Sequence, residues 1–199
     1  MARDTKAIIE SLHAIGAVQF GEFALKSGLI SPVYIDLRLL PSYPSLLRDV
    51  AREMAMVARG LAFDRIAAIP LGGLPIGTAL CLEMDRPLIY PRPEAKQHGT
   101  RRAVEGFYNR GDTVLVVDDL ISTGSSKLEA IGPLLAEGLQ LRDVLVVVDR
   151  EQGGKDELAK QGFTLHALVT FSHVLEVLAE GERITPADVA RVRQYLRGG

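Results

Sequence analysis

The chain of 199 residues has little cysteine, little net charge and no long hydrophobic run. Its one cysteine, Cys81, cannot form a disulfide or a thiol-rich zinc site within a single chain. The formal net charge of -2 at pH 7 gives no general attraction to nucleic acid or to an anionic membrane, so a polyanion would need a local site. No stretch reaches about 18 consecutive apolar residues, which excludes a candidate membrane span. These absences predict a cytoplasmic globular protein with no nucleic-acid or membrane partner.

The first residues, MARDTKAIIESLHAIG, mix charged and apolar side chains at helical spacing. A secretory signal peptide needs an uninterrupted apolar core, so this pattern favours a helix over residues 4–14. The chain length is that of one ordinary domain, and we expect residues 1–199 to form a single domain.

Short apolar segments rich in β-branched residues alternate with helical patterns along most of the chain. The segments predicted as strands are 65–69, 87–91, 113–118, 144–149 and, more weakly, 164–169. Helices are predicted at 73–84, 125–137, 155–161 and 171–180. Strands that are apolar on both faces and separated by helices are typical of parallel sheets. The sequence therefore predicts an α/β protein with an open, mostly parallel twisted sheet flanked by helices.

Both ends of the chain carry elements outside this alternation. Ahead of it we expect a strand at 34–38 and a helix at 45–59, which with the first helix would form an N-terminal hood. Near the other end, Thr185 is followed by Pro186 and, three residues after Thr185, by Asp188. This pattern is typical of a capped helix start, so a terminal helix should follow.

One connection is unusually long. Residues 92–110 contain several arginines and lysines and show neither helical nor strand periodicity. Connections of this length without structure of their own are uncommon in compact domains and are usually lids or binding loops. We therefore expect a long mobile loop that covers a site.

The stretch VLVVDDLISTGSSKLEAI, residues 114–131, combines two kinds of polar group near the predicted end of a strand. Asp118 and Asp119 are adjacent acids, whereas residues 122–126 are all small and mostly carry hydroxyls. Unpaired N–H groups at the start of the following helix favour an anion, and carboxylates suit sugar hydroxyls. Ligands of open α/β sheets bind beyond the carboxyl ends of the strands. The stretch therefore predicts a site for a phosphorylated ribose.

Parts of this stretch also fit a nucleotide-hydrolysing site or a simple helix cap. A strand that ends in two acids resembles the magnesium-binding strand of P-loop NTPases, but the sequence contains no GxxxxGK[ST] motif. A turn of Ser, Thr and Gly before a helix can be an N-cap with no ligand. The adjacent acids together with the run of small residues favour a binding loop over a simple cap.

The segment VLVVDDLISTGSS is similar to the phosphoribosyl-diphosphate motif of the type I phosphoribosyltransferases. In that family the acids hold the ribose hydroxyls and the loop holds the 5'-phosphate. The Gly-rich turn IPLGGLPIG, residues 69–77, is well placed for the diphosphate. The resemblance implies that phosphoribosyl diphosphate contacts Asp118, Asp119, Leu120, Ile121, Ser122, Thr123, Gly124, Ser125 and Ser126.

Three further stretches resemble the orotate phosphoribosyltransferases, in the form found in bifunctional UMP synthases. Residues 23–38 resemble their N-terminal signature, residues 92–106 their mobile catalytic loop, and residues 145–158 the segment whose arginine recognises orotate. The resemblance implies orotate contacts at Lys26, Tyr34, Ser122 and Arg150. It implies diphosphate contacts at Arg92, Lys96 and His98, and catalytic roles for Lys96, His98 and Asp119.

From the residues alone, some of these side chains could have ordinary structural roles. Lys26 could be a solvated lysine of a turn, and Tyr34 could belong to the core. Arg150 stands at the end of a predicted strand and could pair with Glu151 or Asp156.

The resemblance implies an enzyme that joins orotate and 5-phosphoribosyl 1-diphosphate in de novo pyrimidine biosynthesis. Mg2+ would arrive with the diphosphate, and no metal-binding residues of the protein are expected. The family also implies a homodimer in which loop 92–110 completes the neighbour's site. The sequence departs from the family at Pro93, where a lysine is usual. A transferase for another nucleobase, or a regulatory protein with this fold, is the alternative.

Overall fold

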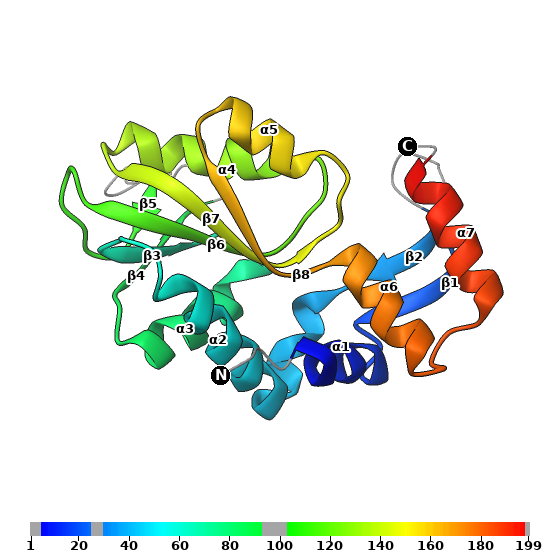
Figure 1. Ribbon diagram of the computed structural model, residues 1–199. Helices are drawn as coiled ribbons and strands as arrows, with labels where there is room; N and C mark the ends of the chain where they lie inside the picture. Colours follow the sequence, from blue (N-terminus) through cyan, green and yellow to red (C-terminus); the bar gives the residue numbers. More distant parts are fainter. Residues whose placement is uncertain (1–4, 25–29, 93–102, 198–199) are drawn as a thin grey trace.

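The computed structural model describes residues 5–24, 30–92 and 103–197. Within these ranges a central sheet has the strand order β5-β4-β3-β6-β7-β8 (Figure 1). The strands are β3 Arg65–Ala68, β4 Leu88–Pro91, β5 Val104–Glu105, β6 Thr113–Ile121, β7 Gln140–Asp149 and β8 Thr164–Thr170. Neighbouring strands are parallel except β4 and β5, which are antiparallel. The predicted open, mostly parallel sheet is confirmed.

The two faces of the sheet bury separate apolar layers because the strands are apolar at both alternating positions. Along β6, Leu115 and Val117 pack into one layer. Val114 and Val116 pack into the other. This is why the central strands read as nearly continuous apolar runs in the sequence.

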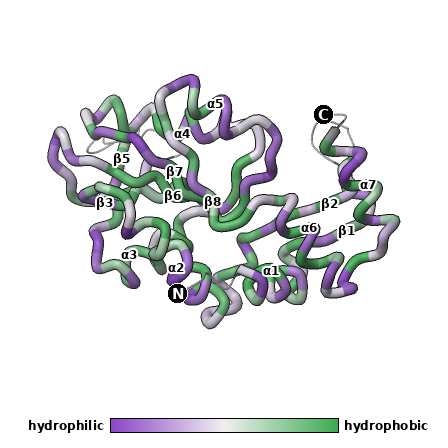
Figure 2. Tube along the Cα trace, viewed as in Figure 1, coloured by the Kyte–Doolittle hydropathy of each residue, from purple (hydrophilic) through white to green (hydrophobic). Residues whose placement is uncertain are grey.

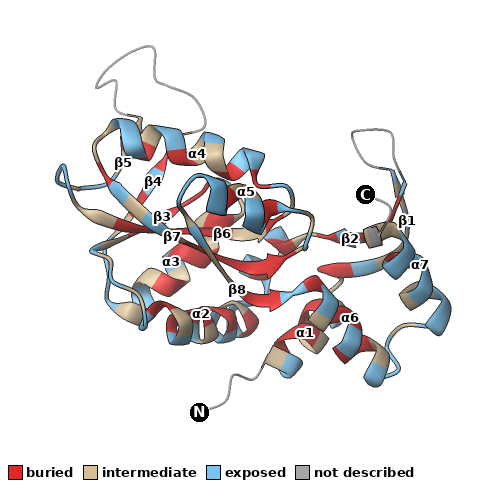
Figure 3. Cartoon of the chain, turned by 45° about the horizontal axis from the view of Figure 1, so that its top comes forward, coloured by how far each residue is buried: buried red, intermediate tan, exposed pale blue. Residues whose placement is uncertain are grey.

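Helices cover both faces of the sheet. Residues of α2 (Pro44–Ala58) and α3 (Gly73–Met84) pack into the first layer, and residues of α4 (Ser125–Ala136) and α5 (Gly154–Lys160) into the second. Hydrophobic residues run along the central strands (Figure 2), and the strands are buried between helices whose outer sides are exposed (Figure 3). Within the described ranges, no helix combines the length and apolar character that a membrane crossing requires.

A smaller group of elements stands beside the sheet and draws on both ends of the chain (Figure 1). It contains α1 (Thr5–Ala14), β1 (Val18–Ala24), β2 (Ile30–Ile35), α6 (Phe171–Glu180) and α7 (Pro186–Arg197). The strands form an antiparallel hairpin, α7 contacts β2, and α1 contacts α6. The predicted hood is therefore built from C-terminal helices as well as N-terminal elements. The prediction that the helix at 45–59 belongs to it is wrong, because the apolar side of α2 packs on the sheet.

The strand predicted at 34–38 is wrong in its bounds, and the sequence pattern held no sign of β1 or β5. β2 ends at Ile35, and the next residue, Asp36, caps a short 3-10 helix, Leu37–Ser42, since its side chain accepts a hydrogen bond from the N–H of Arg38 at 3.1 Å. β1 mixes buried and exposed residues without strict alternation, and β5 has two residues. Such short or irregular strands form because a partner strand is present, and they carry little signal of their own.

α7 begins with the predicted capping pattern. The Thr185 hydroxyl oxygen accepts a hydrogen bond from the N–H of Asp188 at 3.2 Å. In return, the Asp188 carboxylate accepts the N–H of Thr185 at 3.1 Å and its hydroxyl at 2.6 Å. The start of the terminal helix is therefore fixed by two residues that local sequence alone identifies.

The substitution Thr185→Ala is expected to lower the free energy of unfolding by about 1 kcal/mol, because an N–H at the helix start loses its acceptor. Chemical denaturation measures this change. Thr78→Ala is the matched control, since the exposed Thr78 hydroxyl donates to the Leu74 carbonyl within α3 and caps no helix start, and its effect should stay below about 0.5 kcal/mol. Equal losses in both variants would show that the cap is not the source.

Candidate active site

The candidate site lies where the path of the chain through the sheet reverses. From β3 the chain crosses to β4 on one side, and from β6 it crosses to β7 on the other, while β3 and β6 are neighbours. Ligands of open α/β sheets bind at the carboxyl ends of strands at this kind of switch point. A cleft of about 420 Å³ opens there, and its charged lining residues are Arg92, Asp118, Asp119, Lys127 and Glu129.

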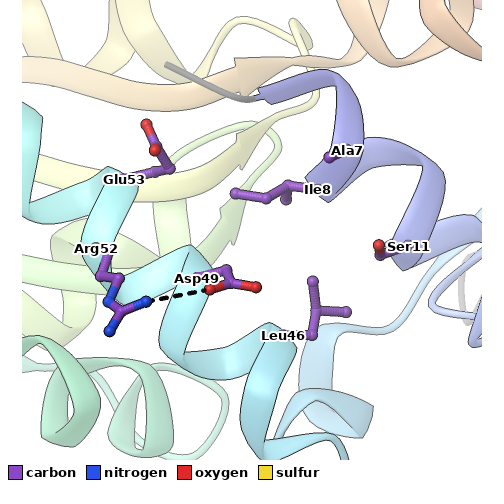
Figure 4. A pocket seen from close by; sticks show the side chains of 7 residues that line it. All are labelled: Ala7, Ile8, Ser11, Leu46, Asp49, Arg52 and Glu53. Atoms are coloured by element: carbon purple, nitrogen blue, oxygen red, sulfur yellow. Dashed lines mark ion pairs between the residues drawn. The ribbon is translucent and has the colours of Figure 1, made fainter. Parts of the chain in front are cut away.

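Another cavity, of about 310 Å³, lies between α1 and α2 (Figure 4). Its polar lining residues are Ser11, Asp49, Arg52 and Glu53, and an ion pair of 3.7 Å joins Arg52 to Asp49. Of the predicted site residues that the structure describes, none lines this cavity. The cleft at the switch point is therefore the candidate active site.

The two adjacent acids point toward different elements. β6 continues to Ile121, beyond the predicted strand end, so successive side chains from Asp118 onward alternate between the faces of the sheet. Asp118 reaches α4, where it meets Lys127. Asp119 faces the turn before α3, where a Cβ added to Gly72 would lie 2.3 Å from the Asp119 Oδ2 atom. A glycine at position 72 thus leaves the space that the Asp119 carboxylate occupies.

Asp118 forms a buried ion pair with Lys127, a residue of the first turn of α4. The distance from Lys127 Nζ to Asp118 Oδ2 is 2.5 Å, and the two residues are 7% and 3% exposed. The other oxygen, Oδ1, accepts the backbone N–H of Asp119 at 2.8 Å. Burial raises the pKa of the Asp118 carboxyl to about 7, and the Lys127 ammonium opposes this rise. The carboxylate is thus held at both oxygens.

The loop after β6 leaves the start of α4 open. Gly124 precedes the helix with φ of 90°, in the left-handed region that favours glycine, and no side chain caps the helix. The hydroxyl oxygens of Thr123 and Ser125 lie 3.4 Å apart, and both residues are exposed, as is Ser126. Ser122 is half-buried. Unpaired N–H groups at a helix start, surrounded by hydroxyls, suit the oxygens of a phosphate.

The two apolar residues predicted to contact the ligand have side chains in the core. Ile121 is buried, and Leu120 is partly buried against the apolar layer of the other face. The N–H of Leu120 donates to Asp119 Oδ1 at 2.7 Å. Any contact of these residues with a ligand would therefore use backbone atoms.

Arg92 reaches the cleft from the end of β4. Its guanidinium forms an ion pair with Glu105 of β5, and its buried Nε has no hydrogen-bond partner among the described residues. Such a buried donor costs free energy, which an acceptor on a ligand would offset. The other predicted cationic residues of the site, Lys26, Lys96 and His98, lie outside the described residues.

Arg150 follows β7 directly and lies beside the loop after β6. Its backbone N–H donates to the carbonyl of Ile121 at 2.9 Å. The residue is half-buried, and burial lowers the pKa of its guanidinium. Within the described part of the chain it forms no ion pair, and Glu151 instead accepts the N–H of Ser172 at 2.7 Å. The arginine is therefore open to an anionic ligand.

Tyr34 belongs to the hairpin of β1 and β2, and its side chain contacts neighbours from that region of the chain. Its ring stacks on Phe23 with 5.5 Å between the ring centroids. Its hydroxyl donates to Asp36 at 3.5 Å and accepts from Arg38 at 3.3 Å. Within the described residues, no hydrogen bond, ion pair or ring contact joins Tyr34 to Arg150.

Lys127 and Gly72 were not among the predicted site residues. Lys127 had a signal, because it lies four and seven residues before Ile131 and Leu134 on the helix stripe that faces the sheet, where a lysine needs a partner. Gly72 lies in the Gly-rich turn 69–77 that the sequence placed near the diphosphate, but the pattern did not indicate its contact with Asp119. Its role depends on which strand end lies opposite, and that is decided by the fold.

The phosphoribosyl transferase domain model matches residues 43–179, which is more than half of the chain. The chain therefore belongs to the phosphoribosyl transferase domain family. The orotate phosphoribosyltransferase of Pyrococcus furiosus is 44% identical over 161 residues, which are 80% of this chain and 88% of the relative. Within the family the chain thus groups with the orotate phosphoribosyltransferases, and the resemblance seen in the sequence motifs is confirmed.

Longer relatives match almost the whole chain. The uridine 5'-monophosphate synthase of Bos taurus is 41% identical over 193 residues, which are 96% of this chain and 40% of the relative. The solved structure of the UMP synthase of Leishmania donovani is 43% identical with a TM-score of 0.91, and the match covers 98% of this chain and 43% of that one. The chain therefore spans about two fifths of the length of these synthases.

Proposed function

We propose that the chain is an orotate phosphoribosyltransferase of pyrimidine biosynthesis. It would join orotate and 5-phosphoribosyl 1-diphosphate to form orotidine 5'-monophosphate and diphosphate. One arrangement carries the proposal: an uncapped helix start behind two acids, with a half-buried arginine that has no ion-pair partner among the described residues beside it. The relatives named orotate phosphoribosyltransferase support the same activity.

The sugar phosphate fits the loop after β6. Its terminal phosphate would accept the N–H groups at the start of α4 and the hydroxyls of residues 122–126. The ribose hydroxyls would donate to Asp118 and Asp119, since carboxylates are acceptors and would repel the phosphate. Arg92 and the turn at 70–73 would face the diphosphate. Mg2+ would bind as part of this substrate, through its diphosphate and ribose oxygens and water.

The reaction separates charge at the sugar. N1 of orotate forms a bond to C1 of the ribose and gives up its proton to the diphosphate or to water, while the bond from C1 to the diphosphate oxygen breaks, so positive charge builds on the ring and negative charge on the leaving group. Cations over the diphosphate stabilise this transition state more than the ground state, especially where water is excluded. We assign this role to Lys96 and His98, with Arg92 at the edge of the cleft.

The base would be recognised by its carboxylate. A guanidinium binds a carboxylate through two parallel hydrogen bonds, and burial strengthens this interaction. Arg150 is half-buried next to the loop that contains Ser122, so both could contact orotate. Lys26 and Tyr34 would complete the base site. Uracil and the purines lack the carboxylate and would leave Arg150 without a partner.

A direct assay tests the proposal. The protein is incubated with phosphoribosyl diphosphate, Mg2+ and, separately, orotate, uracil, hypoxanthine or adenine. We expect a nucleotide product with orotate only. Turnover of a neutral base and not of orotate would contradict the assigned specificity, and absence of any product would favour a regulatory protein with the same fold.

The substitution Arg150→Lys is expected to raise the KM for orotate by at least about tenfold, because lysine keeps the charge but cannot make the two parallel hydrogen bonds. The KM for phosphoribosyl diphosphate should change little. Steady-state kinetics with each substrate varied in turn separates the two constants. Arg142→Lys, at an exposed position near the beginning of β7, is the matched control. A common rise in both KM values would remove Arg150 from base recognition.

Further properties belong to the same proposal. The chain would form one domain over residues 1–199 and act in the cytoplasm as a homodimer, with loop 92–110 of one subunit completing the site of the other. Most of that loop, residues 93–102, lies outside the described residues. Sedimentation of the purified protein and mixing of inactive variants test the dimer.

A further inference from the structure

Lys127 occupies a position where a charged residue is unusual. It belongs to the stripe of α4 that faces the sheet, together with Ile131 and Leu134, and it is 7% exposed. Lysine is almost never buried to this extent without a partner. Its partner is Asp118, one of the two acids that the proposed function assigns to the ribose.

The contacts of Asp118 tie three parts of the site together. Lys127 Nζ lies 2.5 Å from Oδ2, which links the strand to the first turn of α4. The N–H of Asp119 donates to Oδ1 at 2.8 Å, which fixes the backbone before the second acid. Both Asp118 and Lys127 line the cleft. Each carboxylate oxygen has a second lone pair, so Asp118 can still accept a hydroxyl from the cleft side.

We propose that Lys127 is a positioning residue of the ribose site, whose buried ammonium favours the ionised form of the Asp118 carboxylate and holds it where the ribose hydroxyls would bind. This inference rests on the proposed function and extends it to a side chain that does not itself need to touch the substrate. Lys127 acts through Asp118 and, through the Asp119 backbone, on the second acid.

Among the charged residues around the cleft, Lys127 is the one that offsets the negative charge of Asp118. The charged residues that line the cleft with Asp118 are Lys127 and Glu129 on α4, Asp119 on β6 and Arg92 at the end of β4, and of these Lys127 and Asp119 act on the Asp118 carboxyl directly. Arg92 is already paired with Glu105. Within the described lining, Lys127 is therefore the cation that offsets the buried acid, and burial alone would drive Asp118 toward its neutral form.

A purely structural ion pair predicts a different outcome from a positioning pair. If the pair only stabilises the fold, Lys127→Met lowers the melting temperature and leaves the pH dependence of the remaining activity unchanged. If Lys127 keeps Asp118 ionised, the same substitution removes an opposing charge and raises the pKa of Asp118 further. As the pH is lowered, the variant then loses its substrate affinity at a higher pH than the unchanged protein does.

The test compares Lys127→Met with Lys127→Arg in the full chain. At pH 7, Lys127→Met should raise the KM for phosphoribosyl diphosphate about tenfold, with a smaller change in the KM for orotate. The acidic limb of kcat/KM should move up by about one pH unit or more, and activity should recover toward pH 9. Lys127→Arg keeps the charge and should restore most of the affinity. An unmoved pH limb and an unchanged KM in Lys127→Met would overturn the proposal.

A second variant covers the case in which Lys127→Met does not fold. The double substitution Asp118→Asn with Lys127→Met replaces the ion pair by neutral groups of similar size and should fold. It should bind phosphoribosyl diphosphate weakly, and its affinity should no longer fall as the pH is lowered through the pKa of Asp118. An affinity equal to that of the unchanged protein would refute the positioning role of Lys127. Calorimetric binding of phosphoribosyl diphosphate with Mg2+, in the absence of any base, keeps this test separate from failure of the orotate assay.

Discussion

Replacing Lys96 with alanine is expected to lower kcat about a hundredfold to a thousandfold, with the fold intact. Losing one charged hydrogen-bond donor typically lowers kcat by this factor when the donor contacts a group that becomes negatively charged in the transition state. The diphosphate leaves with such a charge, and the resemblance to orotate phosphoribosyltransferases assigns Lys96 to it. Turnover under saturating substrates and the melting temperature are the two measurements.

The matched control is Lys160→Ala, which removes an exposed lysine that forms an ion pair with Glu157 on the surface of α5. A mixing experiment adds a test of the dimer. If loop 92–110 serves the neighbouring subunit, a mixture of Lys96→Ala and Asp119→Asn chains should regain about a quarter of full activity, since half of the dimers are mixed and each has one complete site. Near-normal turnover of Lys96→Ala alone would remove this lysine from the mechanism.

The substitution Gly72→Ala should lower kcat/KM about a hundredfold, because a displacement of roughly 1 Å at a reacting group has that effect. The added Cβ would lie 2.3 Å from Asp119 Oδ2 and 2.7 Å from its Cγ. The end of an aspartate side chain can rotate away, so the protein should fold while the carboxylate leaves its place. Kinetics with phosphoribosyl diphosphate varied, together with thermal unfolding, would show loss of activity without loss of stability.

Gly132→Ala is the control for this prediction. It also adds a methyl group at a glycine, but no atom lies within 4 Å of the new Cβ. Its activity should be unchanged, and its stability should rise slightly because alanine is the better helix former. Full activity of Gly72→Ala would mean that the observed position of Asp119 does not matter for the reaction.

Most strands and helices of the central sheet could be predicted from the amino-acid sequence. Segments such as 144–149 and 171–180 are long or regular enough that their apolar spacing reports the element directly. β1 and β5 were not predicted, because β1 mixes buried and exposed residues irregularly and β5 has only two residues. The end of β6 was placed too early because two acids look like the end of an apolar strand, although the backbone continues its pairing with β7 to Ile121.

The candidate site was only partly visible in the same way. The loop 122–126 and the nearby acids form a local pattern, so their proximity needs no tertiary information. Arg150 could be named from a motif, but its lack of an ion pair with Glu151 or Asp156 depends on packing. The role of Lys127 also required the fold, since its partner lies nine residues earlier on another element.

The amino-acid sequence by itself determined the alternation of strands and helices from β3 to α6, apart from β5, and the chemistry of the loop after β6, since both depend on residues close together in the chain. The tertiary structure decided which way each acid points, what Lys127 neutralises and why position 72 holds a glycine. These features depend on contacts between β6, α4 and the turn after β3. Such contacts form only once the sheet has brought distant segments together, and burial there sets both the space and the charge that each side chain can have.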